Sequence, residues 1–554
     1  MDKDMIIGIS LIALILLIWF MPSEKPETVT PADTAESTGA PPLTGETTPT
    51  PTAMVGTAGD EPTAPATPDA APVASAPSYP PQPPVTVKSD TVEVQFTNVG
   101  ARIASWKLMQ YNAEAGPDGE PVEMIATAPM GKLPLATYWV GAGPQLSENL
   151  NYRIVSRDPN RVVFEREDAA GFIVRKIYTP DLANYTVKLT VEIETPAGQA
   201  GQGRLSVVNY HELEKTEKGM FKPPKGAHHL AYVAGSLESQ FLEKAIGETY
   251  AANVLWAGFS DVYFLSVVAP GTPDNTQDQV VAPAGENSPM SSVLTTGDTP
   301  LTPGSKASFD FATYMGPKKE ETLIAAGHNF DAALDFGWFT VISKLLVRVL
   351  AFFHQVFGNW GVAIILTTLI IKTLLLPLTQ KSYKSMQEMS ALQPKMKEIR
   401  EKYADDREKM NQETMALYKA HGVNPAAGCV PMLLQLPIFL AFYRALYGTI
   451  ELRHAPFGLW IHDLSAPDPL YITPIIMGVT MLVNQLMTPS AADPTQQKIM
   501  LIMPVMFTFF FLNFPSGLVI YWLVNNILTI IQQYYLRKKH GGPTLPGKKA
   551  EAAA

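Results

Sequence analysis

Hydrophobic and polar residues are distributed unevenly along this chain, and the pattern changes several times. Residues 5–21 form the first apolar run and carry no charge. As a helix this run measures about 26 Å, close to the thickness of a bilayer core. A signal peptide is the alternative, but the residues before the run are not basic and no small-residue cleavage site follows it. The sequence therefore favours an uncleaved transmembrane anchor over residues 1–21.

Residues 22–84 have a different composition, rich in proline, threonine, alanine and serine and poor in large apolar side chains. Such a segment cannot bury enough apolar surface to offset the entropy of ordering its backbone. We therefore expect a disordered tether. A flexible chain of about 60 residues has a root-mean-square span of about 45 Å, so the tether leaves the next domain free to move above a membrane.

Residues 85–318 alternate between apolar and polar side chains. Between residues 185 and 194 every second side chain is apolar, namely Tyr185, Val187, Leu189, Val191 and Ile193. This period of two is typical of strands that bury one face only, and turn residues such as Asp158-Pro159-Asn160 separate the strands. The pattern predicts a large antiparallel β-sandwich domain over 85–318.

Residues 337–357 show the spacing of a helix instead. Apolar residues recur three and four positions apart, and Lys344, Arg348 and His354 lie elsewhere on the helix. An apolar face beside a basic one is typical of a helix that lies in the membrane interface. An ordinary core helix is the alternative. We expect residues 319–358 to be a connector that ends in this amphipathic helix.

Five further apolar runs are long enough to suggest membrane spans: 360–378, 430–450, 471–487, 499–513 and 518–535. With the N-terminal anchor they predict a polytopic α-helical membrane protein of six transmembrane helices, whose last five form a core over 359–536. The loop 379–424 and the tail 537–554 are rich in lysine and arginine, whereas 451–470 carries only Arg453. Because basic loops remain in the cytoplasm, both termini are predicted there and the β domain outside.

The basic loop 379–424 has an apolar stripe of its own. Its members recur at helical spacing and include Met386, Met389, Leu392, Met396, Ile399 and Tyr403. The stripe predicts a helical hairpin with a thin, methionine-rich interface, and Pro394 is expected to kink its first arm. The hairpin is either self-contained or a mobile docking arm for a partner or nascent chain.

Composition narrows the function classes. The chain of 554 residues is 46% hydrophobic but only 17% charged, and its net charge of −10 argues against a general nucleic-acid binder. Its single cysteine, Cys429, excludes an intrachain disulfide and a cysteine-rich zinc site. We find neither a metal-ligand cluster nor a catalytic set of residues, so the sequence predicts a non-enzyme without a cofactor.

Because charges are rare in the apolar runs, Lys372 within 360–378 is informative. A charge near the middle of a bilayer costs about 2.5–3.5 kcal/mol on insertion scales. Its side chain either snorkels toward the interface or lines a hydrated functional cavity, and the residues alone favour neither. Other polar side chains at similar depths could hydrate a groove with it; they are Thr367, Thr368, Gln435, Asn484, Gln485, Asn525 and Asn526. Methionines such as Met432 add adaptable apolar surface.

Several motifs in order through residues 337–536 resemble the YidC-type membrane protein insertases in their Gram-negative six-span form. They include Gly358-Asn-Trp-Gly361, Asn424-Pro-Ala-Ala-Gly-Cys-Val-Pro431, Trp460-Ile-His-Asp-Leu464 and Phe514-Pro-Ser-Gly517. The resemblance implies an inner-membrane insertase and chaperone with a periplasmic β-supersandwich and a groove open to cytoplasm and lipid. Lys372 stands where the family usually has arginine, and Thr368 matches a groove position one turn earlier. Trp522 matches a groove tyrosine, with Tyr521 adjacent.

The implied partners are nascent membrane proteins, the Sec translocon, membrane lipids, and the ribosome or targeting factors, which would bind the cytoplasmic hairpin and the tail. The expected groove combines Lys372 and Thr368 with Gln435, Trp522, Tyr521, Met432 and Asn525. Two alternatives are a secondary transporter and a structural scaffold of a membrane complex. A transporter would also place polar groups among spans, but the two halves of the chain show no inverted repeat of hydropathy.

Overall fold

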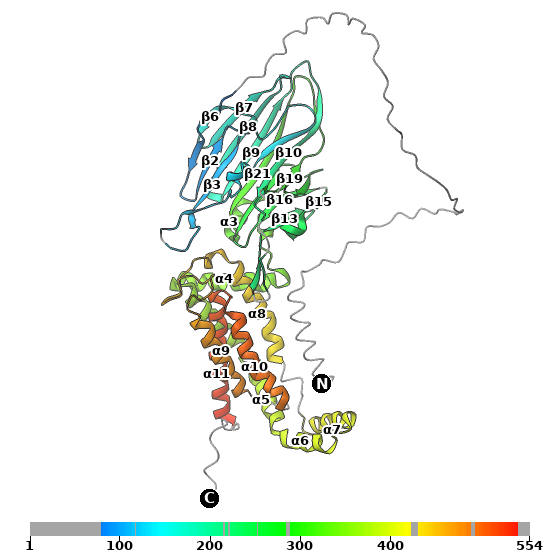
Figure 1. Ribbon diagram of the computed structural model, residues 1–554, viewed down its shortest axis with the longest axis vertical. Coiled ribbons are helices and arrows are strands. Elements are labelled where there is room, and N and C mark those ends of the chain that lie inside the picture. Colours follow the sequence, from blue (N-terminus) through cyan, green and yellow to red (C-terminus); the bar gives the residue numbers. More distant parts are fainter. Residues whose placement is uncertain are drawn as a thin grey trace, which may run out of the picture. The chain divides into compact units, whose positions relative to one another are not determined.

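The structure is a computed structural model that describes residues 79–540, apart from 117, 214–216, 220–221, 252, 284–287, 423–429 and 489–493. The expected anchor at 1–21, nearly all of the expected tether at 22–84, and residues 541–554 of the tail lie outside the described residues. Within them, strands occupy the chain up to Pro317 and helices dominate after it (Figure 1).

The strands pair in antiparallel fashion into three main sheets (Figure 1). The first has four strands, β1 (Val85–Lys88), β2 (Val92–Thr97), β3 (Arg102–Asn112) and β4 (Pro121–Glu123). The second has nine, in the order β14 (Ser236–Phe241), β13 (His228–Val233), β16 (Val254–Ser260), β17 (Phe264–Pro270), β21 (Lys306–Pro317), β9 (Thr186–Glu194), β8 (Ile173–Asp181), β7 (Arg161–Glu167) and β6 (Arg153–Asp158). The third has six, β15 (Thr249–Tyr250), β18 (Gln277–Val281), β19 (Met290–Thr295), β10 (Gly201–His211) and β20 (Thr299–Leu301), with β5 (Ala136–Ala142) also on β10. A separate hairpin joins β11 (Glu217–Gly219) and β12 (Lys222–Lys225).

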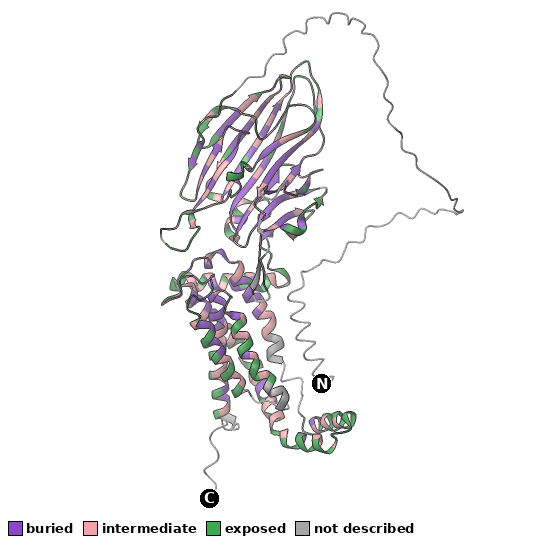
Figure 2. Cartoon of the chain, in the orientation of Figure 1, coloured by how far each residue is buried: buried purple, intermediate pink, exposed green. Residues whose placement is uncertain are grey.

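One hydrophobic core joins these sheets into a β-sandwich. Val94 of β2, Leu205 of β10 and Leu189 of β9 belong to the same buried cluster, although each comes from a different sheet. The period of two explains this packing, because the apolar residues of β9 are all buried while Lys188 points outward. Figure 2 shows the same arrangement as buried strands through the sandwich. The β-sandwich expected from the sequence is confirmed.

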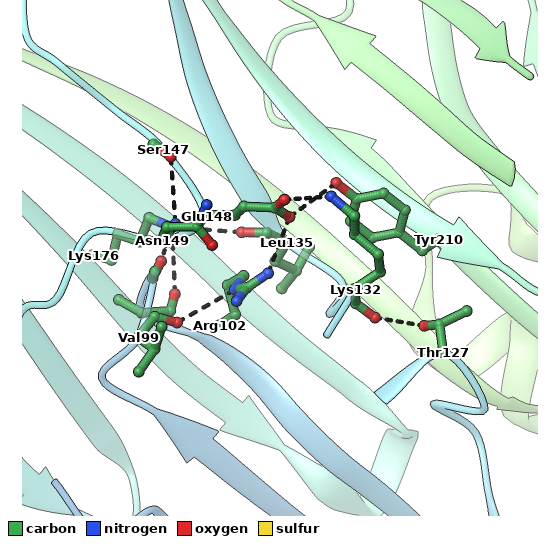
Figure 3. Close-up of polar contacts among 12 residues, drawn as sticks. Val99, Arg102, Thr127, Lys132, Leu135, Ser147, Glu148, Asn149, Lys176 and Tyr210 are labelled. Carbon is green, nitrogen blue, oxygen red and sulfur yellow. Dashed lines mark hydrogen bonds and ion pairs between the residues drawn. The ribbon is translucent and has the colours of Figure 1, made fainter. Parts of the chain in front are cut away.

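A carboxylate with three partners lies at the rim of this core (Figure 3). Glu148 accepts hydrogen bonds from the guanidinium of Arg102 and the hydroxyl of Tyr210, both at 3.2 Å, and it also pairs with Lys132. Arg102 is nearly inaccessible, so its charge depends on this carboxylate for compensation. The cluster therefore connects β3 and β10 through the segment that precedes β6.

Lys176 of β8 is a second buried cation in the same region, only 1% exposed. Its ammonium donates to the backbone carbonyls of Gly100 and Ala101 at 2.6 and 3.3 Å and lies 3.5 Å from that of Leu135. Burial, together with the charge of Arg102, lowers the pKa of Lys176 well below its usual value. Ala101 and Leu135 have positive φ angles of 47° and 64°, so two of the carbonyls that Lys176 contacts belong to residues in the strained left-handed region.

Short helices connect the strands and lead to the helical region: η1 (Ala128–Met130), η2 (Leu182–Asn184), α2 (Leu242–Ala245), α3 (Glu320–Ala326), η3 (Phe330–Ala333) and η4 (Gly337–Phe339). The helical region then consists of α4 (Thr340–Phe357), α5 (Trp360–Ala391), α6 (Gln393–Lys402), α7 (Arg407–Ala420), α8 (Val430–Gly448), η6 (Ile450–Leu452), α9 (Ile472–Met487), α10 (Pro494–Phe511) and α11 (Ser516–His540). Among the described residues, α4 and α5 are long and apolar enough to cross a membrane, and α9 and residues 499–511 are shorter apolar helices.

The helical hairpin expected over 379–424 differs from the sequence prediction. We expected Pro394 to kink a helix, but α5 ends at Ala391 and Pro394 lies in the first turn of a new helix, α6. A proline fits there because the first turn has no intrahelical acceptor for its missing N–H. The helix α5 continues past Pro377 and has 32 residues in all. Its length of about 48 Å exceeds the thickness of a bilayer core, about 30 Å.

The β domain should lose stability in mild acid because of His228. Burial and the nearby charge of Lys318 lower the pKa of His228 to about 4. In the unfolded chain the pKa of this histidine has its ordinary value of about 6.5. As the pH falls below that value, the unfolded state binds a proton while the folded state does not. Stability should therefore fall between about pH 6.5 and pH 4 and level off below.

Hydrogen–deuterium exchange of β13 in the detergent-solubilised full chain, corrected for intrinsic rates, measures this change. His228→Phe keeps a ring against Phe241, whose centroid lies 4.1 Å away, and removes the titration. We expect exchange of β13 to rise from about pH 7 to about pH 5 in the wild type and to change less in the variant. An equal rise in both proteins would contradict the assignment.

Candidate functional site

Lys372 lies inside the longest apolar helix and is the sole charged residue between 360 and 378. It is partly buried, about 18 Å along α5 from the N-terminal end of the helix. Its ammonium donates to the side-chain oxygen of Asn525 at 3.1 Å and to the hydroxyl oxygen of Thr529 at 2.8 Å, both on α11. Both partners are neutral, so the positive charge is solvated by dipoles rather than cancelled by a carboxylate.

The hydroxyl of Thr529 has a fixed orientation. It donates its proton to the backbone carbonyl of Asn525 at 2.7 Å, so only its lone pairs remain to face Lys372. The amide oxygen of Asn525 is likewise an acceptor. An ammonium has three N–H groups. Two are therefore directed at α11, and the third is free of these two partners.

A second polar contact fixes the register between α5 and α11. The side-chain amide of Gln532 donates to the hydroxyl of Thr379 at 2.8 Å. This pair and the pair of Lys372 with Asn525 have the same sequence separation of 153 and lie one heptad apart on both helices. The two helices therefore run parallel and in register, as in a coiled coil.

The same register places Thr368 level with Tyr521, one turn before Lys372. Both are buried, at 2% and 1% exposure. The hydroxyl of Thr368 donates to the carbonyl of Ile364 at 2.7 Å, while the hydroxyl of Tyr521 accepts from the amide of Gln435 on α8 at 2.8 Å. These predicted site residues thus occupy the interior of the bundle next to Lys372.

Trp522 points to a different neighbourhood from Tyr521. Its ring meets Phe439 of α8 edge-on at 4.7 Å and lies 5.3 Å from Phe511 of α10, and it is only partly buried. Tyr521 is fully buried, stacked on Phe442 at 4.3 Å. Of the two adjacent aromatic residues, Trp522 is therefore the more accessible.

The other side of α11 is joined to α9 by amides. The side chain of Asn526 donates to the hydroxyl of Thr480 at 3.3 Å, and that of Asn484 donates to the carbonyl of Asn526 at 3.2 Å. One heptad further, the amide of Gln533 donates to the hydroxyl of Thr488 at 3.0 Å. The doublets Asn525-Asn526 and Gln532-Gln533 thus each direct one amide to α5 and one to α9.

The structure places the predicted site residues in two direct pairs. Lys372 contacts Asn525, and Gln435 contacts Tyr521. Thr368 and Trp522 lie beside them, whereas the side chain of Met432 lies outside the described residues. Sequence reasoning did not single out Thr529 or Gln532. The signal was their spacing of four and seven residues after Asn525, which places all three on one face of a helix.

The part of the chain that the structure describes has no group of three or more histidine, cysteine, aspartate or glutamate side chains that could hold a metal ion. The Lys372 neighbourhood offers amide and hydroxyl oxygens, one ammonium and aromatic rings. Such a set can hydrate and hydrogen-bond a polar segment, but it offers neither a nucleophile paired with a base nor a phosphate-binding loop.

Comparisons with known proteins match both regions. A family model described as the YidC periplasmic domain matches residues 84–349, and one described as the 60Kd inner membrane protein matches residues 352–542. The membrane protein insertase YidC of Geotalea daltonii is 40% identical over 463 residues, covering 82% of this chain and 86% of the relative. That of Pelobacter propionicus is 37% identical over 564 residues, covering 97% and 99%.

Among solved structures, the chain is similar to the crystal structure of an active YidC insertase with its first transmembrane domain resolved. The identity is 20%, the match covers 84% of this chain and 95% of the other, and the TM-score is 0.36. Because a TM-score of 0.36 is low, the family of this chain is established by the sequence matches alone.

The parallel register of α5 and α11 predicts a specific cross-link. With Cys429 replaced by serine, cysteines at Thr379 and Gln532 should be joined rapidly by a short bifunctional thiol reagent in native membranes. A control pair of Thr379 with Ile531, whose side chain is 58% exposed on another face of α11, should react at most about a tenth as fast. Mobility on denaturing gels measures the linked fraction. Equal linking of both pairs would contradict the register.

Proposed function

Because this chain belongs to the YidC family of membrane protein insertases, it inserts proteins into the inner membrane, and we propose that the substrate's polar segment passes beside Lys372. The ammonium of Lys372, within an apolar helix, donates hydrogen bonds to two side chains that are both neutral, and this contact supports the proposal. An isolated charge at this depth is unfavourable by about 2.5–3.5 kcal/mol, and water lowers that penalty. A hydrated groove formed by Lys372, Thr368, Gln435, Asn525, Tyr521, Trp522 and Met432 accounts for its presence.

In this mechanism the groove lowers the barrier to moving polar groups into the bilayer. The ammonium and the amides around it replace part of the water that a substrate's outer, often acidic, segment loses. The substrate's apolar helix then moves into lipid, driven by the removal of its own apolar surface from water. The apolar surface that α9 and α10 expose supports this exit route; it includes Ile475, Val479, Leu482, Ile502, Val505 and Phe509 (Figure 2). No nucleotide is required of this chain.

We propose that α4 lies in the membrane–water interface on the periplasmic side of the inner membrane. Its exposed apolar residues include Val341, Leu345 and Val356. Arg348 makes a two-point contact with Glu320 of α3, at 2.9 and 3.3 Å. The helix thus combines an apolar face, which can contact lipid, with a basic residue that pairs with a carboxylate of α3. This combination suits an interfacial helix better than a spanning one. In the same proposal the chain has six spans, both termini in the cytoplasm and the β-sandwich in the periplasm.

The proposed cytoplasmic docking arm is the hairpin of α6 and α7. Its own core is small, formed by Leu392, Met396 and Tyr418, whose hydroxyl lies 3.1 Å from the sulfur of Met396. Most of its remaining surface is charged and exposed. So small a core leaves the hairpin free to change orientation when it binds, which supports a role in contacting the ribosome, a targeting factor or the Sec translocon. The basic tail would contribute to the same contacts and to anionic lipid.

Replacing Lys372 tests the groove directly. In a strain depleted of its own insertase, Lys372→Ala should insert a single-span protein with an acidic outer segment about tenfold more slowly, a loss equivalent to about 1.4 kcal/mol. Lys372→Arg keeps the charge but changes the donor geometry, so it should retain more activity than the alanine variant and less than the wild type. Protease protection of the outer segment after pulse labelling measures the rate.

A substrate whose outer segment has been made neutral and short is the matched control, because its transfer needs less solvation. We expect the alanine variant to insert that control at nearly the wild-type rate. Full insertion of the acidic substrate by Lys372→Ala would remove the central role of the charge.

The scaffold alternative makes an opposite prediction about α4 and the β domain. We expect deletion of residues 85–318 to leave most insertion intact. Leu346→Glu with Leu350→Glu should abolish insertion, because both leucines are buried and a charge there disrupts the packing of α4. Leu346→Met with Leu350→Met conserves volume and serves as the control. Growth of the depleted strain is the readout, and loss of growth with the deletion alone would favour the scaffold.

A further inference from the structure

We propose that Thr529 and Asn525 are positioning residues that hold the Lys372 ammonium at a fixed depth and direct its remaining N–H toward the substrate. This inference rests on the proposed role of Lys372 in insertion. It differs from that role because it assigns a function to two neutral side chains on another helix. The observations that carry it are the two contacts of 3.1 and 2.8 Å and the locked hydroxyl of Thr529.

The depth of the ammonium follows from the helix register. Asn525 is level with Lys372, and Thr529 lies one turn, about 6 Å, further toward the cytoplasmic end. A nitrogen bonded to both oxygens therefore lies within that single turn. A snorkelling lysine would instead extend toward Thr379, about 10 Å along the helix. The contacts thus favour a lysine held within the bundle over one that escapes to the interface.

The acceptors are also built to stay in place. Because the Thr529 proton is bound to the Asn525 carbonyl at 2.7 Å, the hydroxyl cannot turn to donate toward Lys372. The pair of Gln532 with Thr379 fixes α11 against α5 one heptad further on. A flexible four-carbon side chain loses about 2 kcal/mol of rotamer entropy when held, so its ordering requires such a preset pair of acceptors.

Thr373 provides a matched comparison on the other helix. Its hydroxyl donates to the carbonyl of Leu369 at 2.8 Å, the same backbone bond that Thr529 makes, and its side chain is exposed. This bond does not involve Lys372. Replacing either threonine with valine removes a hydroxyl and preserves shape, so only the change at Thr529 should act through the ammonium.

The test measures insertion of the acidic substrate in proteoliposomes containing the full chain, in a double-mutant cycle. Thr529→Val and Asn525→Leu should each slow insertion about three- to tenfold when Lys372 is present. Thr529→Ser keeps the hydroxyl and should insert the substrate at the wild-type rate. Thr373→Val should also leave the insertion rate unchanged. In the Lys372→Ala background, Thr529→Val should have no further effect, because there is no ammonium left to position.

The outcomes separate this inference from the proposed function. An equal slowing by Thr529→Val with and without Lys372, or an effect of Thr373→Val of the same size, would mean a general packing role and overturn the inference. A normal rate for Thr529→Val together with a slow Lys372→Ala would overturn the inference and leave the role of Lys372 standing. A normal rate for Lys372→Ala would overturn the proposed function itself. Thermal unfolding of each variant in detergent confirms that the proteins compared are folded.

Discussion

An ammonium inside a bundle of apolar helices must be supplied with oxygen atoms, and this requirement organises the helical region. The bilayer offers Lys372 nothing in exchange for lost water, so the protein must provide acceptors from a neighbouring helix. Here α11 supplies them through Asn525 and Thr529. Because acceptor and donor must be level, this contact fixes the position of α11 along α5, and the pair of Gln532 with Thr379 one heptad further makes the two helices parallel.

The same helix serves two neighbours by repeating its amides in pairs. Residues one position apart on a helix point about 100° apart, so Asn525 and Gln532 face α5 while Asn526 and Gln533 face α9. Each interhelical amide bond is modest, commonly about 0.6 kcal/mol between membrane helices. These hydrogen bonds are directional, so they fix the rotation of α11 about its axis and its position along α5 and α9. Packing of apolar side chains alone would define both only loosely. The polar contacts of α11 with α5 and α9 can thus remain in place while the outer surfaces of these helices change their contacts.

The sequence predicted the sandwich and the positions of the later helices because both depend on local periodicity. Lys176 of β8 lies on the same face as the buried Val174 and Tyr178, a position that the sequence analysis did not single out. Its partners could not be predicted, because the carbonyls of Gly100 and Leu135 come from distant loops with positive φ. The partners of Lys372 could not be predicted either, because they also lie far from it in the sequence. Asn525 was singled out as polar, but its contact depends on a register between helices separated by 153 positions.

The contacts of Lys372 suit a lysine better than an arginine. Two oxygens that converge on one nitrogen, at 3.1 and 2.8 Å, suit the compact tetrahedral ammonium, whose donors radiate from a single atom. A guanidinium spreads its donors over a planar fork and prefers two acceptors side by side, as in a carboxylate. Asn525 and Thr529 lie one turn apart along α11 and so match the lysine. The charge at this depth is therefore set by a pair of helices, and an exchange of lysine for arginine changes what those helices must provide.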